Sequence, residues 1–126
     1  MNLTRLYAIG FGVVYTLVGI LGFFVAPTLE THNLIIFPVN VLHNIVHLLA
    51  GLAGIAFFMS NRALQYARGM AIIFAVLTVA GLIVPNGFGL VPLGGADIAL
   101  HAATAILAAV AGWLYVSRKE NERVAY

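Results

Sequence analysis

The stretch VNVLHNIVHLLAGLAGIAFFM, from Val39 to Met59, decides the fold of this chain. It contains no Lys, Arg, Asp or Glu, and its apolar residues follow one another without the alternation of a half-buried strand. A helix of roughly 20 residues crosses about 30 Å of hydrocarbon. Because lipid offers the backbone no hydrogen-bond partners, a crossing segment must pair its own peptide groups. The stretch is therefore predicted to be a transmembrane helix.

Three further runs are similarly long and apolar, with Arg68 near the start of one of them as their one charged residue. The whole chain is 63% hydrophobic and 8% charged. Its mean hydropathy is +1.06. Such a composition is typical of a membrane protein, and continuous apolar runs exclude a membrane β-barrel. The sequence predicts an all-α, integral membrane four-helix bundle, with residues 1–126 forming a single transmembrane domain. The predicted spans are Leu6–Ala26, Val39–Met59, Ala67–Val84 and Ile98–Val116.

The positive charges predict the orientation of the bundle. All six fall on one side of an alternating topology, whereas residues 27–37 and 85–96 contain no Lys or Arg. By the positive-inside rule, both termini are expected in the cytoplasm. The net charge of +2 does not indicate nucleic-acid binding, and the absence of Cys excludes disulfides. The cations are Arg5, Arg62, Arg68, Arg118, Lys119 and Arg123.

Two segments of the chain resemble each other. The segment from Pro38 to His47 aligns without gaps with that from Pro92 to His101, which places His43 on Asp97 and His47 on His101. A weaker similarity relates residues 15–24 to residues 74–83. Two helical hairpins of the same topology are therefore expected, as an internal repeat related by a pseudo-two-fold axis along the membrane normal.

The repeat places three histidines within the predicted spans and Asp97 directly before the fourth span. His43 and His47 are four residues apart, as are Asp97 and His101, so each pair shares one face of a helix. His47 and His101 lie roughly 14 Å along the helix axis from the preceding prolines. Three imidazole nitrogens and one carboxylate oxygen would suit zinc, or iron with open positions. His43, His47, Asp97 and His101 are thus candidate metal ligands near the outer face.

A structural role explains the same residues without any cofactor. Asp97 could cap the fourth span, as Asn40 could cap the second. The histidines would then form hydrogen bonds between helices, with Asn40, Asn44, Thr104 or backbone carbonyls as partners. On this interpretation the protein is a non-catalytic structural or accessory subunit. An enzyme is less expected, because no general base separate from the possible ligands is visible.

A haem is a further alternative. His47 and His101, expected on facing helices at one depth, would suit its axial ligation. The small residues beside them would leave room for the macrocycle. These residues are Gly51, Gly54, Ala102, Ala103 and Ala105.

Glycines are frequent in the first two spans. In lipid, small residues allow close approach of helix backbones. Besides packing the bundle, a glycine face could bind a second copy of the chain or a larger membrane complex. The glycines are Gly10, Gly12, Gly19, Gly22, Gly51 and Gly54.

The chain resembles a known family through two patterns taken together. They are N-x-x-H-N-x-x-H-x-x-x-G, which starts at Asn40, and G-A-D-x-x-L-H, which starts at Gly95. The family is that of small bacterial membrane proteins called domain of unknown function 4383, and the resemblance covers nearly the whole chain. It implies a four-helix protein of the bacterial cytoplasmic membrane and assigns no activity. Its signature residues here are Asn40, His43, Asn44, His47, Asp97 and His101.

Overall fold

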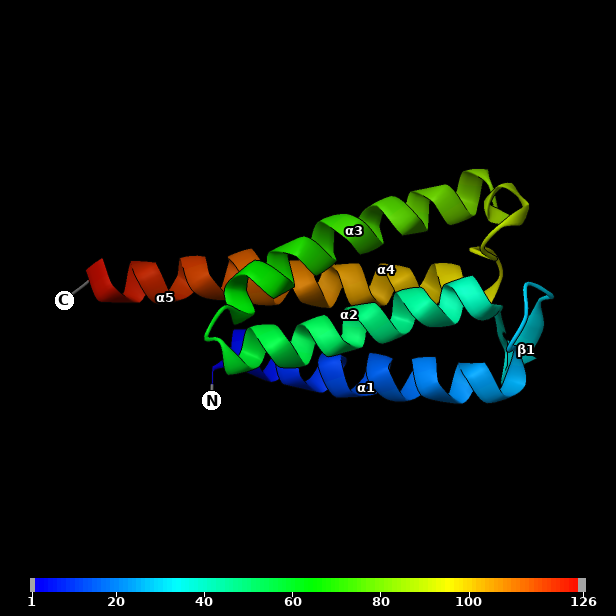
Figure 1. The fold of residues 1–126 in the computed structure, drawn as a ribbon. Helices are drawn as coiled ribbons and strands as arrows, with labels where there is room; N and C mark the ends of the chain where they lie inside the picture. Colours follow the sequence, from blue (N-terminus) through cyan, green and yellow to red (C-terminus); the bar gives the residue numbers. More distant parts are fainter. Residues whose placement is uncertain (1, 125–126) are drawn as a thin grey trace.

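The computed structural model describes residues 2–124 and is almost entirely helical (Figure 1). Four of its helices are long and apolar enough to cross a membrane, so the predicted all-α bundle is confirmed. The main helices are α1 (Leu3–Val25), α2 (Val41–Met59), α3 (Ala63–Ile83) and α4 (Ala96–Ala109). The last of them continues through a π-helical turn, η2 (Val110–Leu114), into α5 (Tyr115–Val124).

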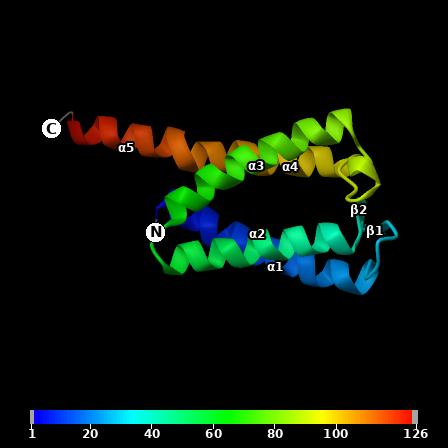
Figure 2. The same cartoon turned by 45° about the horizontal axis from the view of Figure 1, so that its top comes forward.

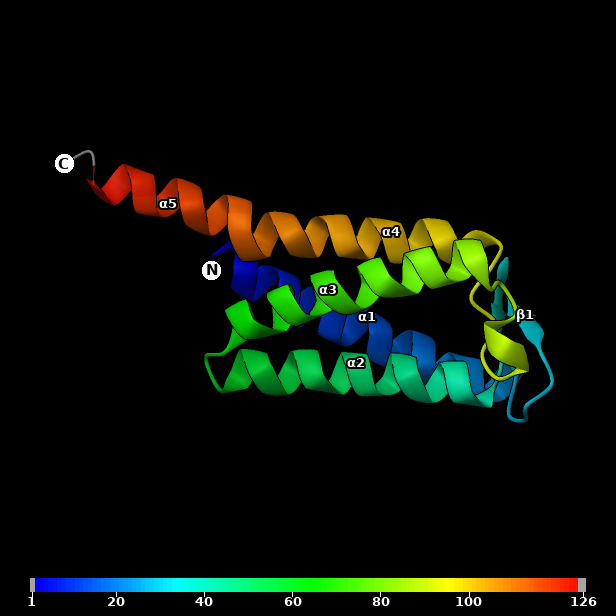
Figure 3. The same ribbon diagram turned by 90° about the horizontal axis from the view of Figure 1, so that it is seen from above.

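The fourth helix is longer than the span predicted for it, because α5 extends past the other helices at the end where the chain begins (Figures 1 and 3). Charged pairs support this extension. Arg118 Nε lies 3.5 Å from Glu122 Oε1, one helical turn away, and Lys119 Nζ lies 3.3 Å from Glu122 Oε2. Pairs at this spacing stabilise a solvated helix.

The two loops at the opposite end have structure of their own. The first forms a short antiparallel hairpin of β1 (His32–Leu34) and β2 (Phe37–Val39), in which Leu34 pairs with Phe37. The second contains a single 3₁₀ turn, η1 (Gly87–Gly89).

The helices pack as two hairpins, α1 with α2 and α3 with α4. Both hairpins begin at the same end of the bundle, as the sequence predicts. Figure 2 shows that α2 and α3 lie together near the turn that joins them and diverge toward the other end. A common origin of the two hairpins by sequence repetition stays a prediction.

Glycines bring α1 and α2 into close backbone contact. A Cβ atom added to Gly12 would lie 2.9 Å from Ile55 N, and one added to Gly19 would lie 2.8 Å from Leu48 N. The added Cβ of Gly51 would overlap Thr16 N. Gly12, Gly19 and Gly51 thus pack inside one chain, whereas Gly10 is exposed on α1. An interface between copies through a glycine face stays a prediction.

The outer faces of the helices are apolar, whereas polar groups gather inside. Phe24, Ile72 and Leu82 are among many large apolar side chains on the outside, while His47, Asp97 and Thr104 are buried. This is the arrangement expected in a bilayer, and it identifies a multi-pass membrane protein.

Candidate metal centre

Asn40 fixes the start of α2 and holds it to both loops at that end. Its side-chain oxygen accepts a hydrogen bond of 3.0 Å from the His43 amide, so the predicted helix cap is confirmed. Its Nδ2 donates to Leu90 O at 2.7 Å and to Leu29 O at 3.3 Å. The first turn of α2, which carries His43, is therefore anchored to backbone from both halves of the chain.

Three imidazoles meet inside the bundle, just below this cap. His43 and His47 come from α2 and His101 from α4, and each is at most 2% exposed. Each histidine contributes one ring nitrogen to a group of three in which all the atoms lie within 4.8 Å of one another. Nε2 of His43 lies 3.0 Å from Nε2 of His47. His47 and His101 thus share one site although they are 54 positions apart in the sequence.

Asp97 lies behind this group of nitrogens. Its Oδ2 is 3.6 Å from Nδ1 of His43, the ring nitrogen that faces away from His47. The residue is fully buried, and neither carboxylate oxygen has a hydrogen-bond partner among residues 2–124. The structure therefore brings Asp97 to the site but places it beside a histidine.

The alternative in which Asp97 caps the fourth span is wrong. The cap of α4 is Gly95, at φ 64°, and no side chain within residues 2–124 caps this helix. Asp97 is already the second residue of the helix, and a capping side chain bonds to the amides of residues two or three positions ahead of it. Its carboxylate instead lies against α2.

No hydrogen bond joins a histidine ring to the side chains of Asn40, Asn44 or Thr104 among residues 2–124. Asn44 Nδ2 donates to Ala26 O at 2.9 Å. Thr104 Oγ1 lies 2.7 Å from the Tyr15 hydroxyl and donates to Leu100 O at 2.8 Å. Among residues 2–124, Nδ1 of His47, Nδ1 of His101 and Oδ1 of Asn44 are buried without a hydrogen-bond partner.

Two aromatic rings complete the surroundings, and neither was among the candidate residues. Tyr15 packs edge-on against His47, with ring centroids 5.2 Å apart, and Phe74 packs edge-on against His101 at 5.3 Å. Tyr15 and Phe74 align in the second similarity noted in the sequence. That alignment is the signal that could have identified them as neighbours of the site.

A cavity of about 250 Å³ opens from the histidines toward the gap between α2 and α3. Apart from the three imidazoles its walls are apolar, with Phe74 and Leu77 on α3 and Phe88 and Leu90 in the second loop. It is smaller than the pockets of about 300–1,000 Å³ that hold drug-sized ligands. Only a small ligand fits beside the imidazoles.

His32 lies outside this site. It sits in β1, about half exposed, with Nε2 3.7 Å from Glu30 Oε2. His32 is therefore a solvent-exposed loop histidine and provides a comparison for the buried ones.

Comparison with known proteins identifies a family. The family model described as Domain of unknown function (DUF4383) matches residues 5–114. No curated protein and no solved structure matches the chain. The matched segment includes α2, α3 and α4 in full, all but the first two residues of α1, and all four residues of the candidate site. The chain belongs to the DUF4383 family.

Proposed function

We propose that this protein binds one transition-metal ion, zinc or iron, inside the membrane through His43, His47 and His101. In a tetrahedral site with metal–nitrogen distances of about 2.0–2.1 Å, ligand nitrogens lie about 3.3 Å apart. Nε2 of His43 and Nε2 of His47 are 3.0 Å apart, and all three ligand nitrogens lie within 4.8 Å. Small rotations of the imidazole rings would bring the three nitrogens to bonding distance from one ion.

The observation that carries the proposal is the buried carboxylate beside these nitrogens. Asp97 is fully buried, and its closest ionisable neighbour is His43, at 3.6 Å. An ionised carboxylate is costly to bury without a compensating charge, above all within a membrane. A divalent cation held by neutral imidazoles supplies that charge a short distance away.

Asp97 acts in this proposal by orienting His43. Histidines that bind metals generally donate their other ring N–H to a carboxylate, a carbonyl or a water molecule. A proton on Nδ1 of His43 would point at Asp97 and leave Nε2 free to bind the ion. The carboxylate thus supports the metal site without being one of its ligands.

Three protein ligands leave one coordination position open to the 250 Å³ cavity. Apart from the histidines, the residues that line this cavity carry no acid or base. Binding of the ion and of one small exchangeable ligand is therefore favoured over catalysis. A haem is disfavoured, because Nε2 of His43 lies 3.0 Å from Nε2 of His47, where the macrocycle would have to pass.

The test is metal binding by the purified protein. Protein extracted in detergent, stripped with a chelator and reloaded with Zn²⁺ or Co²⁺ should retain about one equivalent by elemental analysis. Bound Co²⁺ should give the intense visible bands of a tetrahedral site. His47→Ala should lose both signals, whereas His32→Ala, which removes the exposed histidine, should keep both. Retention of the metal by His47→Ala would refute the proposal.

A structural role is the second candidate, because the polar groups around the site also join the two hairpins. The Tyr7 hydroxyl donates to Thr104 O at 3.3 Å, and the Tyr15 hydroxyl lies 2.7 Å from Thr104 Oγ1. In this role the protein would be a non-catalytic accessory subunit whose polar cluster fixes the register of its helices. Failure to bind metal, together with a lower stability of His47→Ala, would favour it.

A further inference from the structure

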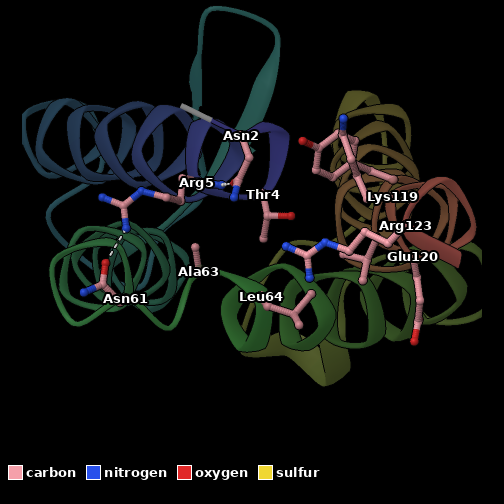
Figure 4. Close-up of a pocket in the computed structure, with 11 residues that line it drawn as sticks. Asn2, Thr4, Arg5, Asn61, Ala63, Leu64, Lys119, Glu120 and Arg123 are labelled. Carbon is pink, nitrogen blue, oxygen red and sulfur yellow. Dashed lines mark hydrogen bonds between the residues drawn. The ribbon is translucent and has the colours of Figure 1, made fainter. Parts of the chain in front are cut away.

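A second cavity, of about 570 Å³, lies at the other end of the bundle, where the chain begins (Figure 4). The first turns of α1 and α3 form two of its sides and α5 forms the third. Arg5, Lys119 and Arg123 line it, and Glu120 is the one acid in its lining among residues 2–124. Lys119 is also paired with Glu122, at 3.3 Å. Figure 4 shows Arg123 pointing from α5 into the space between α1 and α3, while the Glu120 carboxylate points away.

The backbone adds further positive potential. Both α1 and α3 direct their N-termini at this cavity, and amides at a helix N-terminus favour anions. Asn2 caps α1 by accepting a hydrogen bond from the Arg5 amide. At the start of α3 the cap position is Arg62, and no side chain within residues 2–124 bonds to the amides of this first turn as a cap. The combined field selects an anion.

An apolar groove of about 470 Å³ starts at the same turn of α1. Leu6, Gly10 and Val14 of α1 form one wall, and Leu107 and Val110 form the other. Thr4 lines the cavity and Ala111 lines the groove. The two residues are joined by a hydrogen bond of 2.9 Å from Thr4 Oγ1 to Ala111 O. The basic cavity and the apolar groove thus lie on the two sides of one buried contact between α1 and η2.

We propose that these two features together bind one anionic phospholipid, with its phosphate in the basic cavity and an acyl chain in the groove. The cavity alone would suit any phosphate-bearing anion, free or lipid-borne. The groove favours the lipid, because its apolar walls continue from the polar cavity along α1 toward the middle of the membrane. Basic pockets between membrane helices are known to receive lipid headgroups.

The variants follow from the two parts of the site. Arg123→Gln removes a cation from the cavity, and Arg118→Gln is its control, because Arg118 is highly exposed and lies outside the cavity. Gly10→Leu fills the groove. A Cβ at Gly10 meets nothing within 4 Å, so α1 accepts the substitution. Gly69→Leu is the matched control, since Gly69 has equally open surroundings and lines neither feature.

Binding is measured by native mass spectrometry of the full chain in detergent, titrated with phosphatidylglycerol, phosphatidylcholine or inorganic phosphate. Phosphatidylglycerol should bind most tightly, with one tight site. Arg123→Gln should weaken that binding about fivefold, and Gly10→Leu should weaken it at least as much, while both controls bind as the wild type does. Equal binding of the two lipids would overturn the proposal. The proposal would also be overturned if Gly10→Leu bound phosphatidylglycerol with wild-type affinity and inorganic phosphate competed fully with the lipid. That result would indicate a site for the free anion.

Discussion

Oδ2 of Asp97 lies 3.6 Å from Nδ1 of His43, and this contact joins the first turn of α4 to the first turn of α2. The two residues occupy equivalent positions in the two aligned segments of the sequence. One contributes a carboxyl group and the other an imidazole whose second nitrogen faces His47. Equivalent positions have thus taken on different roles at one buried site.

This contact predicts a graded effect on metal affinity. Asp97→Asn preserves the size of the side chain but removes its charge, so His43 is oriented less firmly and the bound cation loses its compensating anion. Zinc affinity should fall about 10–100-fold, with about one equivalent still bound at saturation. A competition titration against a chromophoric chelator measures this. Complete loss of the ion would instead make Asp97 a ligand.

Glu30→Gln is the control for Asp97→Asn. Glu30 faces His32 at a similar distance, 3.7 Å, but on the exposed loop. An exposed pair contributes little to stability and lies outside the proposed site, so zinc affinity should not change. A loss in both variants would show that the effect of Asp97→Asn is not specific to the site.

The sequence predicts the helices well because apolar runs of this length have few alternatives in lipid. Three of the four spans differ from the structure by only a few residues at either end. The exception is the fourth, which continues to Val124. Hydropathy ends a span where charges begin, but pairs such as Arg118 with Glu122 keep the helix intact in water.

The sequence was enough to predict that the three histidines lie together, but not how Asp97 is placed beside them. The i,i+4 spacing places His43 and His47 on one face, and the aligned segments bring His101 to the same depth. Asp97 was harder to place, because an acid near a helix start serves equally well as a cap or as a partner for a buried group. Only the position of α4 against α2 decides between these two roles.

The glycine contacts predict a position-dependent cost of a single methyl group. Gly51→Ala places a Cβ against Thr16 N, which is backbone and cannot rotate away. Overpacking of this kind costs about 1–3 kcal/mol, so the free energy of unfolding in mixed micelles should fall by that amount. Gly10→Ala meets open space and should be neutral or gain up to about 1 kcal/mol from helix propensity. Equal effects at both positions would contradict the close packing of α1 against α2.

The hydrogen bond between Tyr15 and Thr104 predicts an energetic coupling between the hairpins. The hydroxyl of Tyr15 on α1 lies 2.7 Å from Thr104 Oγ1 on α4. A double-mutant cycle of Tyr15→Phe and Thr104→Val, read from unfolding free energies, should give a coupling of about 0.6 kcal/mol, typical of hydrogen bonds between membrane helices. Tyr66→Phe paired with Thr104→Val is the control, because the Tyr66 hydroxyl donates to Ala50 O and should give no coupling.

The positive charges predict which end of the bundle faces the cytoplasm. The sequence contains no Cys, so single cysteines can be introduced as unique labels. Ser60→Cys, in the turn between α2 and α3, should react with a membrane-impermeant maleimide only after the cells are permeabilised. Thr31→Cys, in the loop beside β1, should react in intact cells. Both positions are exposed in the structure, so protection reports the side of the membrane and not burial in the protein. The reverse pattern of labelling would invert the topology and place the basic cavity on the outer surface, whereas the contacts around His43, His47 and His101 would be unaffected.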